Sequence, residues 1–538
     1  MANAYSIILN NITSNYLPPK ISKVNLSFSQ HKYGIVGANG IGKTTLLKLV
    51  LGDIEPNSGS IQCIGSISYM PQLHVSFINS DATIADILGI SDILKSIENV
   101  NNGSCNEHDF EVIGSNWDIE SRTKNALTHF NLNNVDAHSY FKKLSDGEKT
   151  KVLLSKTLIF STDFILFDEP TNNLDKESRN ILYNYIIDSN KGIIVVSHDR
   201  ELLNNMSHII EITSIGINAY GGNYDFYKQQ KETDQQAAED LIKSRIKQLK
   251  KSKYLVQSRL ERHQKNESKG NREKIKQIKA KGSYDKIEIK SKQGRSEKTN
   301  RRIRIQAEHK LGMANNSLNE SKMKLEINKL LNISLDKTKV SNNKIIINIE
   351  DLNFNYVPQK MLINNFNLTI VGPERVAITG RNGTGKSTLI QLILGNLNPS
   401  KGHITCGIPH ITYLDQSVSF LDSNLSILNN FLQCNPESKI FDAYMALSWF
   451  NFCDQDAEKI VGQLSGGEKM RAGLAVALMS KNPPQLIILD EPTNHLDFET
   501  IEAIEQALKM YQGTILAISH DEVFLKNIGI NRYVSVER

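Results

Sequence analysis

One set of short motifs occurs twice in this chain, in the same order. Gly37–Thr44 and Gly380–Ser387 both match G-x-x-x-x-G-K-[ST], a glycine-rich loop whose backbone N–H groups surround a phosphate. Downstream, Asp168–Asp175 reads DEPTNNLD and Asp490–Asp497 reads DEPTNHLD. One phosphate-loop match can arise by chance, but two matches with the same companions cannot reasonably do so. The repeat therefore indicates two phosphate-binding domains in tandem.

The spacing of the motifs gives the domain boundaries. From the glutamate of each acidic pair to the histidine of a later Ser-His-Asp string is 29 residues in both copies. We expect the first domain in residues 1–230, a linker in residues 231–342 and the second domain in residues 343–538. Between its phosphate loop and a later Leu-Ser-x-Gly-Glu string, the first copy is about 23 residues longer than the second. We expect this surplus within residues 81–130, as a short surface arm.

Short apolar runs of buried-strand length lead into the phosphate loops, the acidic motifs and the Ser-His-Asp strings. Because these runs alternate with helical stretches, they predict a parallel sheet covered by helices on both faces. The expected fold class is therefore α/β, with two P-loop domains joined by a long α-helical coiled-coil linker. The expected strands are Ile35–Gly37, Phe164–Asp168, Ile193–Ser197, Val376–Gly380, Leu486–Asp490 and Ile515–Ser519.

The linker follows a different pattern. Its apolar residues begin on the 4-3-7-4 spacing of a coiled-coil seam, and a comparable seam runs from Ala307 to Leu325. Glycines at 270, 282 and 294 make a continuous helix costly between the seams. We expect two antiparallel helices joined by a tip at residues 265–298. A flexible tether is the alternative, although it would not need two seams. The first seam comprises Ile242, Ile246, Leu249, Val256 and Leu260.

Charge is concentrated in the same region. The segment Lys228–Arg304 holds 25 Lys and Arg against 10 Asp and Glu, a net charge of +15, whereas the whole chain carries +5. The two domains are therefore acidic and flank a strongly basic segment. Lys and Arg contacts to phosphates supply most non-specific affinity for nucleic acids, and structured RNA is recognised mainly by shape. The linker is thus a candidate RNA-binding arm.

The phosphate loops indicate a nucleotide substrate, ATP, and the cofactor Mg²⁺. Lys43 and Lys386 are expected to reach the β- and γ-phosphates. The Mg²⁺ is expected to be held by Thr44, Asp168, Ser387 and Asp490, which supply hydroxyl and carboxylate oxygens. The expected nucleotide-binding residues of the loops are Gly37, Asn39, Gly40, Gly42, Lys43, Thr44 and Thr45, and Gly380, Asn382, Gly383, Gly385, Lys386, Ser387 and Thr388.

Catalysis is expected from the residues beside these metal ligands. Glu169 and Glu491 adjoin the aspartates and are candidate general bases for the attacking water; a helix-capping glutamate is the alternative. His198 and His520 recur at the same offset, which favours contact with the γ-phosphate over a structural role. Their Ser-His-Asp strings are not hydrolase triads, because triad residues come from distant positions in the sequence. The motifs together predict a tandem ATPase.

Two further strings complete the pattern: Leu464–Glu468 reads LSGGE and Leu144–Glu148 reads LSDGE. With the loops and acidic motifs, they resemble the ATP-binding cassette (ABC) superfamily, in which the signature of one cassette completes the site of the other. The resemblance implies nucleotide contacts from Ser145, Gly147, Ser465, Gly466 and Gly467, and adenine stacking on Tyr16 and Tyr356, for which a core role is the alternative. It also implies magnesium contacts from Gln72 and Gln416.

Within the superfamily, the chain resembles the ABC-F group, which pairs two cassettes without membrane domains. The features that carry this resemblance are the EPTNxLD strings, Gly-Glu in both signatures and a charged linker entered through Tyr220–Tyr227. It implies a monomer that binds the ribosome near the tRNA exit site. There the linker would act on peptidyl-site tRNA or the peptidyl-transferase region, and the arm would face the L1 stalk. Tuning of translation and protection from antibiotics both stay open.

One departure from the family pattern affects the second site. Asp146 stands where the signature has its first glycine, and in a head-to-tail sandwich it would face the nucleotide held by Gly380–Ser387. A carboxylate near a γ-phosphate is unfavourable, although an acidic residue at a helix N-terminus is stabilising by about 0.3–1 kcal/mol. Ser145 and Gly147 keep their hydrogen-bond donors. We expect an intact but slower second site.

Other classes of protein fit less well. No apolar run approaches the roughly 18 residues of a membrane span, and the first ten residues lack a basic start before their apolar stretch. The five cysteines form no C-x-x-C pair, which favours free thiols and a cytoplasmic location. The ATPase subunit of an exporter remains the alternative, but it does not call for the basic arm. A DNA-repair ATPase would place its coil inside one cassette.

Overall fold

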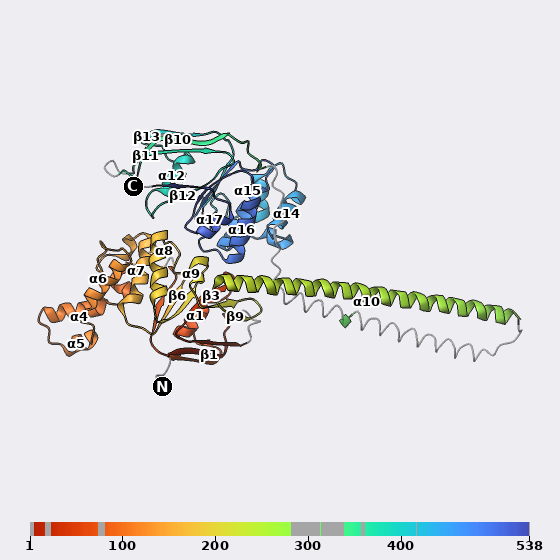
Figure 1. The fold of residues 1–538 in the computed structure, drawn as a ribbon, viewed down its shortest axis with the longest axis horizontal. Helices are drawn as coiled ribbons and strands as arrows, with labels where there is room; N and C mark the ends of the chain where they lie inside the picture. The colour runs from red at the N-terminus through yellow and green to blue at the C-terminus, as the bar shows by residue number, and fades with distance from the viewer. Residues whose placement is uncertain are drawn as a thin grey trace. The chain divides into compact units, whose positions relative to one another are not determined.

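The computed structural model describes residues 5–16, 23–73, 81–280, 312–313, 338–356, 361–415 and 417–536 (Figure 1). The chain divides into two compact units. One comprises Met1–Asp225 and Lys329–Arg538, and so contains both motif-bearing domains; the other is Phe226–Asn328.

The first domain is built on a six-stranded sheet in the order β5-β6-β7-β3-β8-β9. Its strands pair in parallel except for β9, which runs antiparallel to β8. They are β3 (Lys32–Gly37), β5 (Ile67–Met70), β6 (Phe164–Asp168), β7 (Gly192–Val196), β8 (His208–Ile212) and β9 (Ile217–Gly221). A three-stranded antiparallel sheet adds β1 (Ser6–Thr13), β2 (Val24–Phe28) and β4 (Ser58–Ile64). The helices near the motifs are α1 (Lys43–Leu51), α7 (Asp146–Ile159), α8 (Lys176–Asp188) and α9 (Arg200–Asn204).

The second domain repeats this plan with a parallel five-stranded sheet in the order β14-β15-β16-β12-β17. Its strands are β12 (Arg375–Thr379), β14 (Ile411–Leu414), β15 (Leu486–Asp490), β16 (Thr514–Ile518) and β17 (Arg532–Ser535). The antiparallel sheet consists of β10 (Ile345–Phe354), β11 (Ile363–Val371) and β13 (Lys401–Cys406). The matching helices are α12 (Lys386–Ile393), α15 (Gly466–Leu478), α16 (Phe498–Met510) and α17 (Glu522–Asn527). The predicted α/β class is confirmed.

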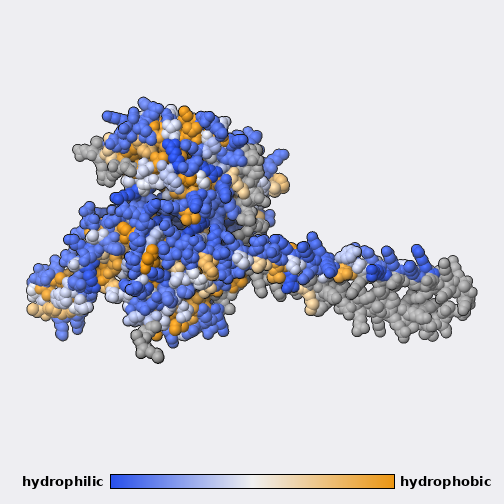
Figure 2. Space-filling view, viewed as in Figure 1, coloured by the Kyte–Doolittle hydropathy of each residue, from blue (hydrophilic) through white to orange (hydrophobic). Residues whose placement is uncertain are grey.

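The linker begins with one long helix, α10 (Tyr224–Ala280), of 57 residues. Figure 2 shows mostly hydrophilic side chains along it. The helix passes through Gly270 and includes residues 265–280 of the range expected for the tip. A glycine costs a helix interior about 1 kcal/mol relative to alanine, and the Lys, Arg, Gln and Glu residues around Gly270 are good helix formers. Of the expected second helix, only residues 312–313 are described, and they are helical. The hairpin and its seams remain predictions.

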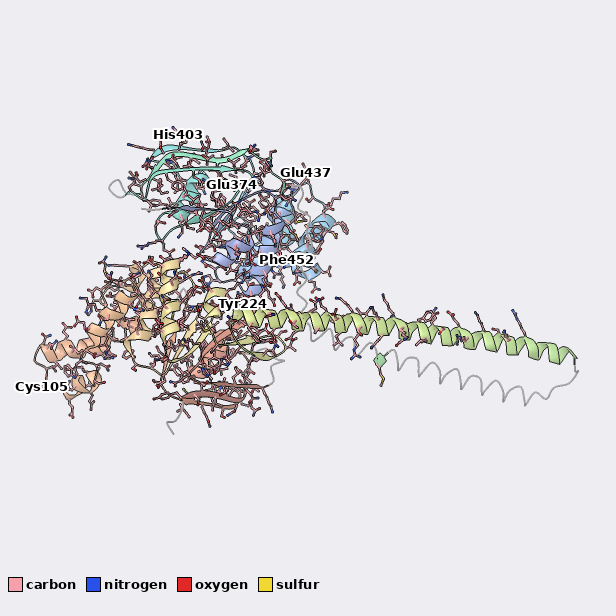
Figure 3. All side chains as sticks on the ribbon, viewed as in Figure 1. Cys105, Tyr224, Glu374, His403, Glu437 and Phe452 are labelled. Atoms are coloured by element: carbon pink, nitrogen blue, oxygen red, sulfur yellow. The ribbon has the colours of Figure 1, made fainter. Side chains whose placement is uncertain are left out.

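The first domain has an extra pair of helices, α4 (Ser91–Asn101) and α5 (Glu107–Ile113), in the range where we expect its surplus residues. They lie between α3 (Ile84–Leu88) and α6 (Ile119–His129), whereas the second domain has only α13 (Ile427–Cys434) and α14 (Ile440–Trp449) at this place. Figure 3 labels Cys105 in the turn between α4 and α5. The buried Asp109 carboxylate accepts hydrogen bonds from Asn99 (3.1 Å) and Ser104 (2.8 Å), which hold this turn.

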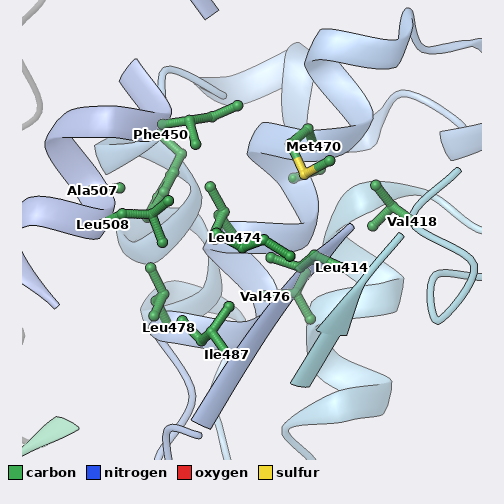
Figure 4. Packing of buried hydrophobic residues seen from close by; sticks show 14 of the residues in the cluster. Leu414, Val418, Phe450, Met470, Leu474, Val476, Leu478, Ile487, Ala507 and Leu508 are labelled. Atoms are coloured by element: carbon green, nitrogen blue, oxygen red, sulfur yellow. The ribbon is translucent and has the colours of Figure 1, made fainter. Parts of the chain in front are cut away.

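The apolar core of the second domain positions its signature helix. Leu474 and Val476 of α15 pack with Leu414 of β14 and Ile487 of β15, and all four are at most 1% exposed (Figure 4). Burial of each such side chain contributes about 1.5–3 kcal/mol. Helix α15 is therefore held tightly against the sheet whose strand ends carry the motif residues.

The part of the chain that the structure describes contains no helix that is both long and apolar enough to cross a bilayer. Its carboxylate, histidine and cysteine side chains form no group of three or more that would hold a metal by themselves. The five cysteines are free and exposed.

Candidate functional site

Both phosphate loops join the end of a strand to the start of a helix. Gly40 and Gly42 have φ angles of 76° and 104°, and Gly383 and Gly385 repeat them at 78° and 99°. These angles lie in the left-handed region, where residues with a Cβ are strained. The N–H groups at the start of α1 and α12 have no partner within their helices, so they are available to an anion.

The loop lysines are buried beneath their loops. Lys43 Nζ donates to the carbonyl oxygens of Gly37 (2.7 Å) and Ala38 (3.1 Å) and lies 2.8 Å from His198 Nε2. Lys386 Nζ makes the same bonds to Gly380 (2.6 Å) and Arg381 (3.2 Å) and lies 3.3 Å from His520 Nε2. Burial lowers the pKa of both lysines. The two sites therefore share one Lys-His arrangement, as the equal spacing of the motifs predicts.

The histidines beside them are held neutral. Burial, helped by the neighbouring lysine, lowers the pKa of His198 and of His520 to about 3. A neutral imidazole has one donor and one acceptor nitrogen, so it can accept from the lysine or donate to an anion, depending on its tautomer. Contact with a γ-phosphate remains a prediction.

Each site contains an oxygen pair of the kind that Mg²⁺ requires. Thr44 Oγ1 donates to Asp168 Oδ2 (2.7 Å), and Asp168 is 1% exposed at the end of β6. In the second site, Ser387 and Tyr413 both hydrogen-bond the Asp490 carboxylate, the latter over 3.2 Å. One hydroxyl and one carboxylate, completed by substrate phosphates, are a typical protein contribution to magnesium binding, so these residues fit the ion. Gln72 lines the first cavity, and Gln416 lies outside the described residues.

The candidate bases have an unusual backbone conformation. Glu169 and Glu491 have φ angles of 51° and 48°, a left-handed conformation that costs a non-glycine residue about 1–3 kcal/mol. Their N–H groups donate to the next strand, to Val196 O (2.8 Å) and Ile518 O (2.9 Å). This conformation recurs in both copies, which indicates that the fold holds each carboxylate at a fixed place.

Burial also makes these carboxylates more basic. It raises the pKa of Glu169 to about 8 and that of Glu491 to about 7. Glu169 Oε1 lies 3.6 Å from His198 Nε2, and Glu491 Oε1 lies 3.5 Å from His520 Nε2. A group with a pKa near neutrality is suited to accepting a proton from water. The helix-capping alternative does not account for this position, because Asp175 and Asp497 cap the helices that follow.

The two cavities differ in what closes them. The second, of about 1010 Å³, is lined by its own loop and by Ser145–Glu148 from the first domain. The first, of about 420 Å³, is lined by its own loop and by His495 of the second domain. The lining residues of the first cavity do not include Ser465, Gly466 or Gly467. Residues of the first signature therefore line the cavity of the opposite phosphate loop, and those of the second signature are not among the residues that line the first cavity.

The candidate adenine-stacking tyrosines are exposed, which removes the alternative of a core role. Tyr16 lines the first cavity and is 68% exposed, while Tyr356 is 64% exposed and lies 3.3 Å, Oη to Oγ1, from Thr388. Stacking on adenine remains a prediction for both.

Hydrogen bonds between each phosphate loop and the opposite DEPTNxLD string, which sequence analysis did not predict, hold the two domains together. Asn39 N donates to Asp497 Oδ2 (3.0 Å), and Asn39 Nδ2 donates to His495 O (2.8 Å). In the second site, Asn382 Nδ2 donates to Asn173 O (2.9 Å) and Asn382 N to Asp175 Oδ2 (3.4 Å). The ends of the DEPTNxLD strings therefore contact the opposite phosphate loop. Their repetition was the available signal, but a sequence does not show which domain they face.

The substituted residue of the first signature lies in the second cavity, as expected for a head-to-tail arrangement. Ser145 caps α7, with Glu148 completing a capping box, and Ser465 and Glu468 do the same for α15. Asp146 lines the second cavity and pairs with Lys149, 3.0 Å away. This buried lysine offsets part of the negative charge that the sequence places there.

Comparisons with known proteins agree with this geometry. The family model described as "ABC transporter" matches residues 21–172 and 363–494. The ATP-binding protein Uup of Haemophilus influenzae is 30% identical and covers 93% of this chain and 74% of its own. The probable ATP-binding protein YbiT of Escherichia coli O157:H7 is 28% identical and covers 97% and 94%. ABC transporter F family member 5 of Arabidopsis thaliana is 27% identical and covers 94% and 71%.

Solved structures with the same fold cover almost the whole chain. The structure named "RNase-L Inhibitor" has a TM-score of 0.58 at 17% identity, over 98% of this chain and 87% of that one. A crystal structure of archaeal ribosome recycling factor aABCE1 in complex with ribosomal stalk protein aP1 has a TM-score of 0.56 at 17% identity, over 96% and 84%. At this identity the likeness concerns the fold alone.

Proposed function

Because the chain belongs to the ABC transporter family, in its F group of tandem ATP-binding proteins, we propose that it is an ATPase that acts on the ribosome. The observation that carries the ATPase part is the same Lys-His-Glu-Asp arrangement around each phosphate loop, with each loop bonded to the opposite domain. ATP bound at either loop would therefore lie next to the contacts that hold the two domains together.

Each residue of a site has a separate role in the proposed reaction. The loop N–H groups and Lys43 or Lys386 bind the phosphates of ATP. Mg²⁺, when bound to the Thr-Asp or Ser-Asp pair, would offset the charge of the β- and γ-phosphates. Glu169 or Glu491 accepts the proton of the attacking water, since burial has made it basic. The neutral His198 or His520 holds the γ-phosphate side of the site without adding a charge.

The ribosomal part of the proposal is supported by charge and by relatives. The segment Lys228–Arg304 carries a net charge of +15, which suits an RNA surface. Two neighbours of the same fold are described as a ribosome recycling factor and as ribosome-bound. We propose that the linker contacts rRNA and peptidyl-site tRNA from a position near the tRNA exit site. Its action there is either tuning of translation or protection of the peptidyl-transferase centre from antibiotics.

We further propose that the protein works as a monomer in the cytoplasm. The contacts that join the two domains come from one chain, so a second copy is not needed to complete either loop. Light scattering at the concentration used for ATPase assays should give the mass of one chain, 60.5 kDa. A dimer that dissociates with loss of turnover would contradict this.

Sedimentation with ribosomes tests the function directly. The variant Glu169→Gln with Glu491→Gln, loaded with ATP, should pellet with ribosomes. Because this variant cannot hydrolyse ATP, the nucleotide should stay bound between the two domains and keep them together. The same variant without nucleotide should pellet less. Recovery in membrane fractions, with no ATP-dependent association with ribosomes, would support the exporter subunit instead.

The substitution Asp146→Gly should speed hydrolysis at the second site by about fivefold, which corresponds to roughly 1 kcal/mol. It removes a carboxylate from that cavity, and the effect is modest because Lys149 already pairs with it. Single-turnover phosphate release is measured in the Glu169→Gln background, where only the second site keeps its base. In the Glu491→Gln background the same substitution should change nothing. Equal rates in both backgrounds, with and without Asp146, would make this residue neutral.

A further inference from the structure

Phe498 lies between the first site and the start of the linker helix. It is the first residue of α16, and its ring centroid is 5.2 Å from that of His198 and 4.9 Å from that of Tyr224. Tyr224 is the first residue of α10 and is 4% exposed; Figure 3 labels it there. One aromatic ring of the second domain thus contacts both a site residue of the first domain and the residue from which α10 begins.

A buried ion pair fixes the helices around this ring. Arg200 Nη1 of α9 donates to Glu505 Oε1 of α16 over 2.7 Å, and Asn527 Nδ2 donates to Glu505 Oε2 over 2.9 Å. Arg200 and Glu505 are 5% and 8% exposed, and the guanidinium lies 6.0 Å from the centre of the Phe498 ring. Charge-assisted hydrogen bonds of this kind are short and directional, so they hold the two domains in one relative position here.

At the second site, the residues that match Phe498 and Arg200 form neither the ring contacts nor the buried ion pair. In the repeat, Lys176 of the first domain matches Phe498, and Glu522 of the second domain matches Arg200. These two side chains form an ion pair in which they are 66% and 56% exposed. An exposed pair contributes little, about 0–1 kcal/mol, and Lys176 has no ring to place against His520. The aromatic contact with α10 therefore belongs to the first site alone.

We propose that Phe498 is a positioning residue through which nucleotide at the first site, and not at the second, holds the start of α10. The preceding residue, Asp497, accepts a hydrogen bond from Asn39 N in the first phosphate loop. Closing of the second domain on that loop therefore presses Phe498 onto His198 and Tyr224 together. The inference rests on the proposed binding of ATP, and it assigns control of the linker to one of two similar sites.

Amide hydrogen exchange of peptides covering residues 224–235 tests the proposal. In the full-length variant Glu169→Gln with Glu491→Gln, ATP should slow exchange there by about tenfold. Adding Phe498→Ala should abolish this ATP dependence, whereas Lys176→Ala, the matched change beside the second site, should leave it intact. Phe498→Tyr keeps the ring and should behave as the parent, which separates a lost contact from misfolding.

Turnover gives a second readout. Phe498→Ala should lower single-turnover hydrolysis when only the first site keeps its base, because His198 loses its neighbour, and should leave the second site unchanged. Persistence of ATP-dependent protection in Phe498→Ala would overturn the proposal, as would its loss in Lys176→Ala. Measuring the ATP affinity of the parent distinguishes failure of the role proposed for Phe498 from failure of the proposed ATPase function. A parent that binds ATP without protecting residues 224–235 refutes only the role of Phe498, and a parent that does not bind ATP refutes the ATPase itself.

Discussion

Steady-state phosphate release should fall by at least about 100-fold in the variant that carries both Glu169→Gln and Glu491→Gln. Glutamine keeps the size and hydrogen-bonding capacity of the side chain but cannot accept the proton of the attacking water. Both glutamates are buried, held in a left-handed backbone conformation and more basic than usual, so no other described carboxylate has the same position. ATP binding should persist, because the loop N–H groups and the two lysines are unchanged.

Phosphate release and ATP affinity are measured on the same preparations. Glu98→Gln, on the exposed surface of α4, is the control for the amide substitution and should match the parent. The single variants should each retain turnover at one site, at unequal rates, since only the second cavity contains Asp146. Turnover of the double variant within a factor of two of the parent would remove both glutamates from the role of base.

Ribosome binding should depend strongly on the basic residues of α10. Replacing the exposed Lys247, Lys250, Lys251 and Lys253 with Gln should reduce affinity by about 100- to 1000-fold at moderate salt. It should also lower the slope of log affinity against log salt by about 3, since each phosphate contact contributes up to about 0.9 for duplex DNA and a similar amount elsewhere. ATP hydrolysis without ribosomes should be unaffected, because none of these residues lies in either site.

The control keeps charge at the same positions. Arginine in place of the four lysines should bind ribosomes as the parent does, with the same salt slope. These substitutions change the charge and leave the length of α10 unchanged. Deletion of residues 265–298 would remove the last 16 residues of α10, residues 265–280, together with their charge. If the glutamine variant sedimented with ribosomes at the parental affinity and slope, this part of α10 would have no share in RNA binding.

The sequence was sufficient wherever chemistry requires particular residues at particular offsets. Phe164–Asp168 was predicted as a buried strand that ends in a metal ligand, and it is β6, with Asp168 bonded to Thr44. Lys43 and His198, which were each expected at the phosphates, lie 2.8 Å apart. A phosphate loop and a strand-end aspartate must meet at one edge of a parallel sheet, whatever else the chain does.

Contacts made only by packing could not be predicted in this way. Arg200 and Glu505 lie 305 positions apart and belong to no motif, so only the paired domains bring them together. The partnership of Asp146 with Lys149 was within reach, since the two are three residues apart on one helix, but a sequence does not show which charges are buried. The left-handed backbone of Glu169 is contrary to the preference of glutamate and is imposed by its neighbours.

Helix α10 runs without interruption from Tyr224 to Ala280, and this continuity gives changes in its length a geometric meaning. Each added residue advances everything beyond it by about 1.5 Å and turns it by about 100° around the axis. Insertion of three or four residues therefore lengthens the helix by roughly one turn, whereas two residues would aim its far basic side chains in nearly the opposite direction. A step of seven adds about 10.5 Å and restores the original direction to within about 20°. A change in the length of this helix therefore changes both how far it extends and the direction of the side chains beyond the change. Only changes close to whole turns alter the length and keep the direction.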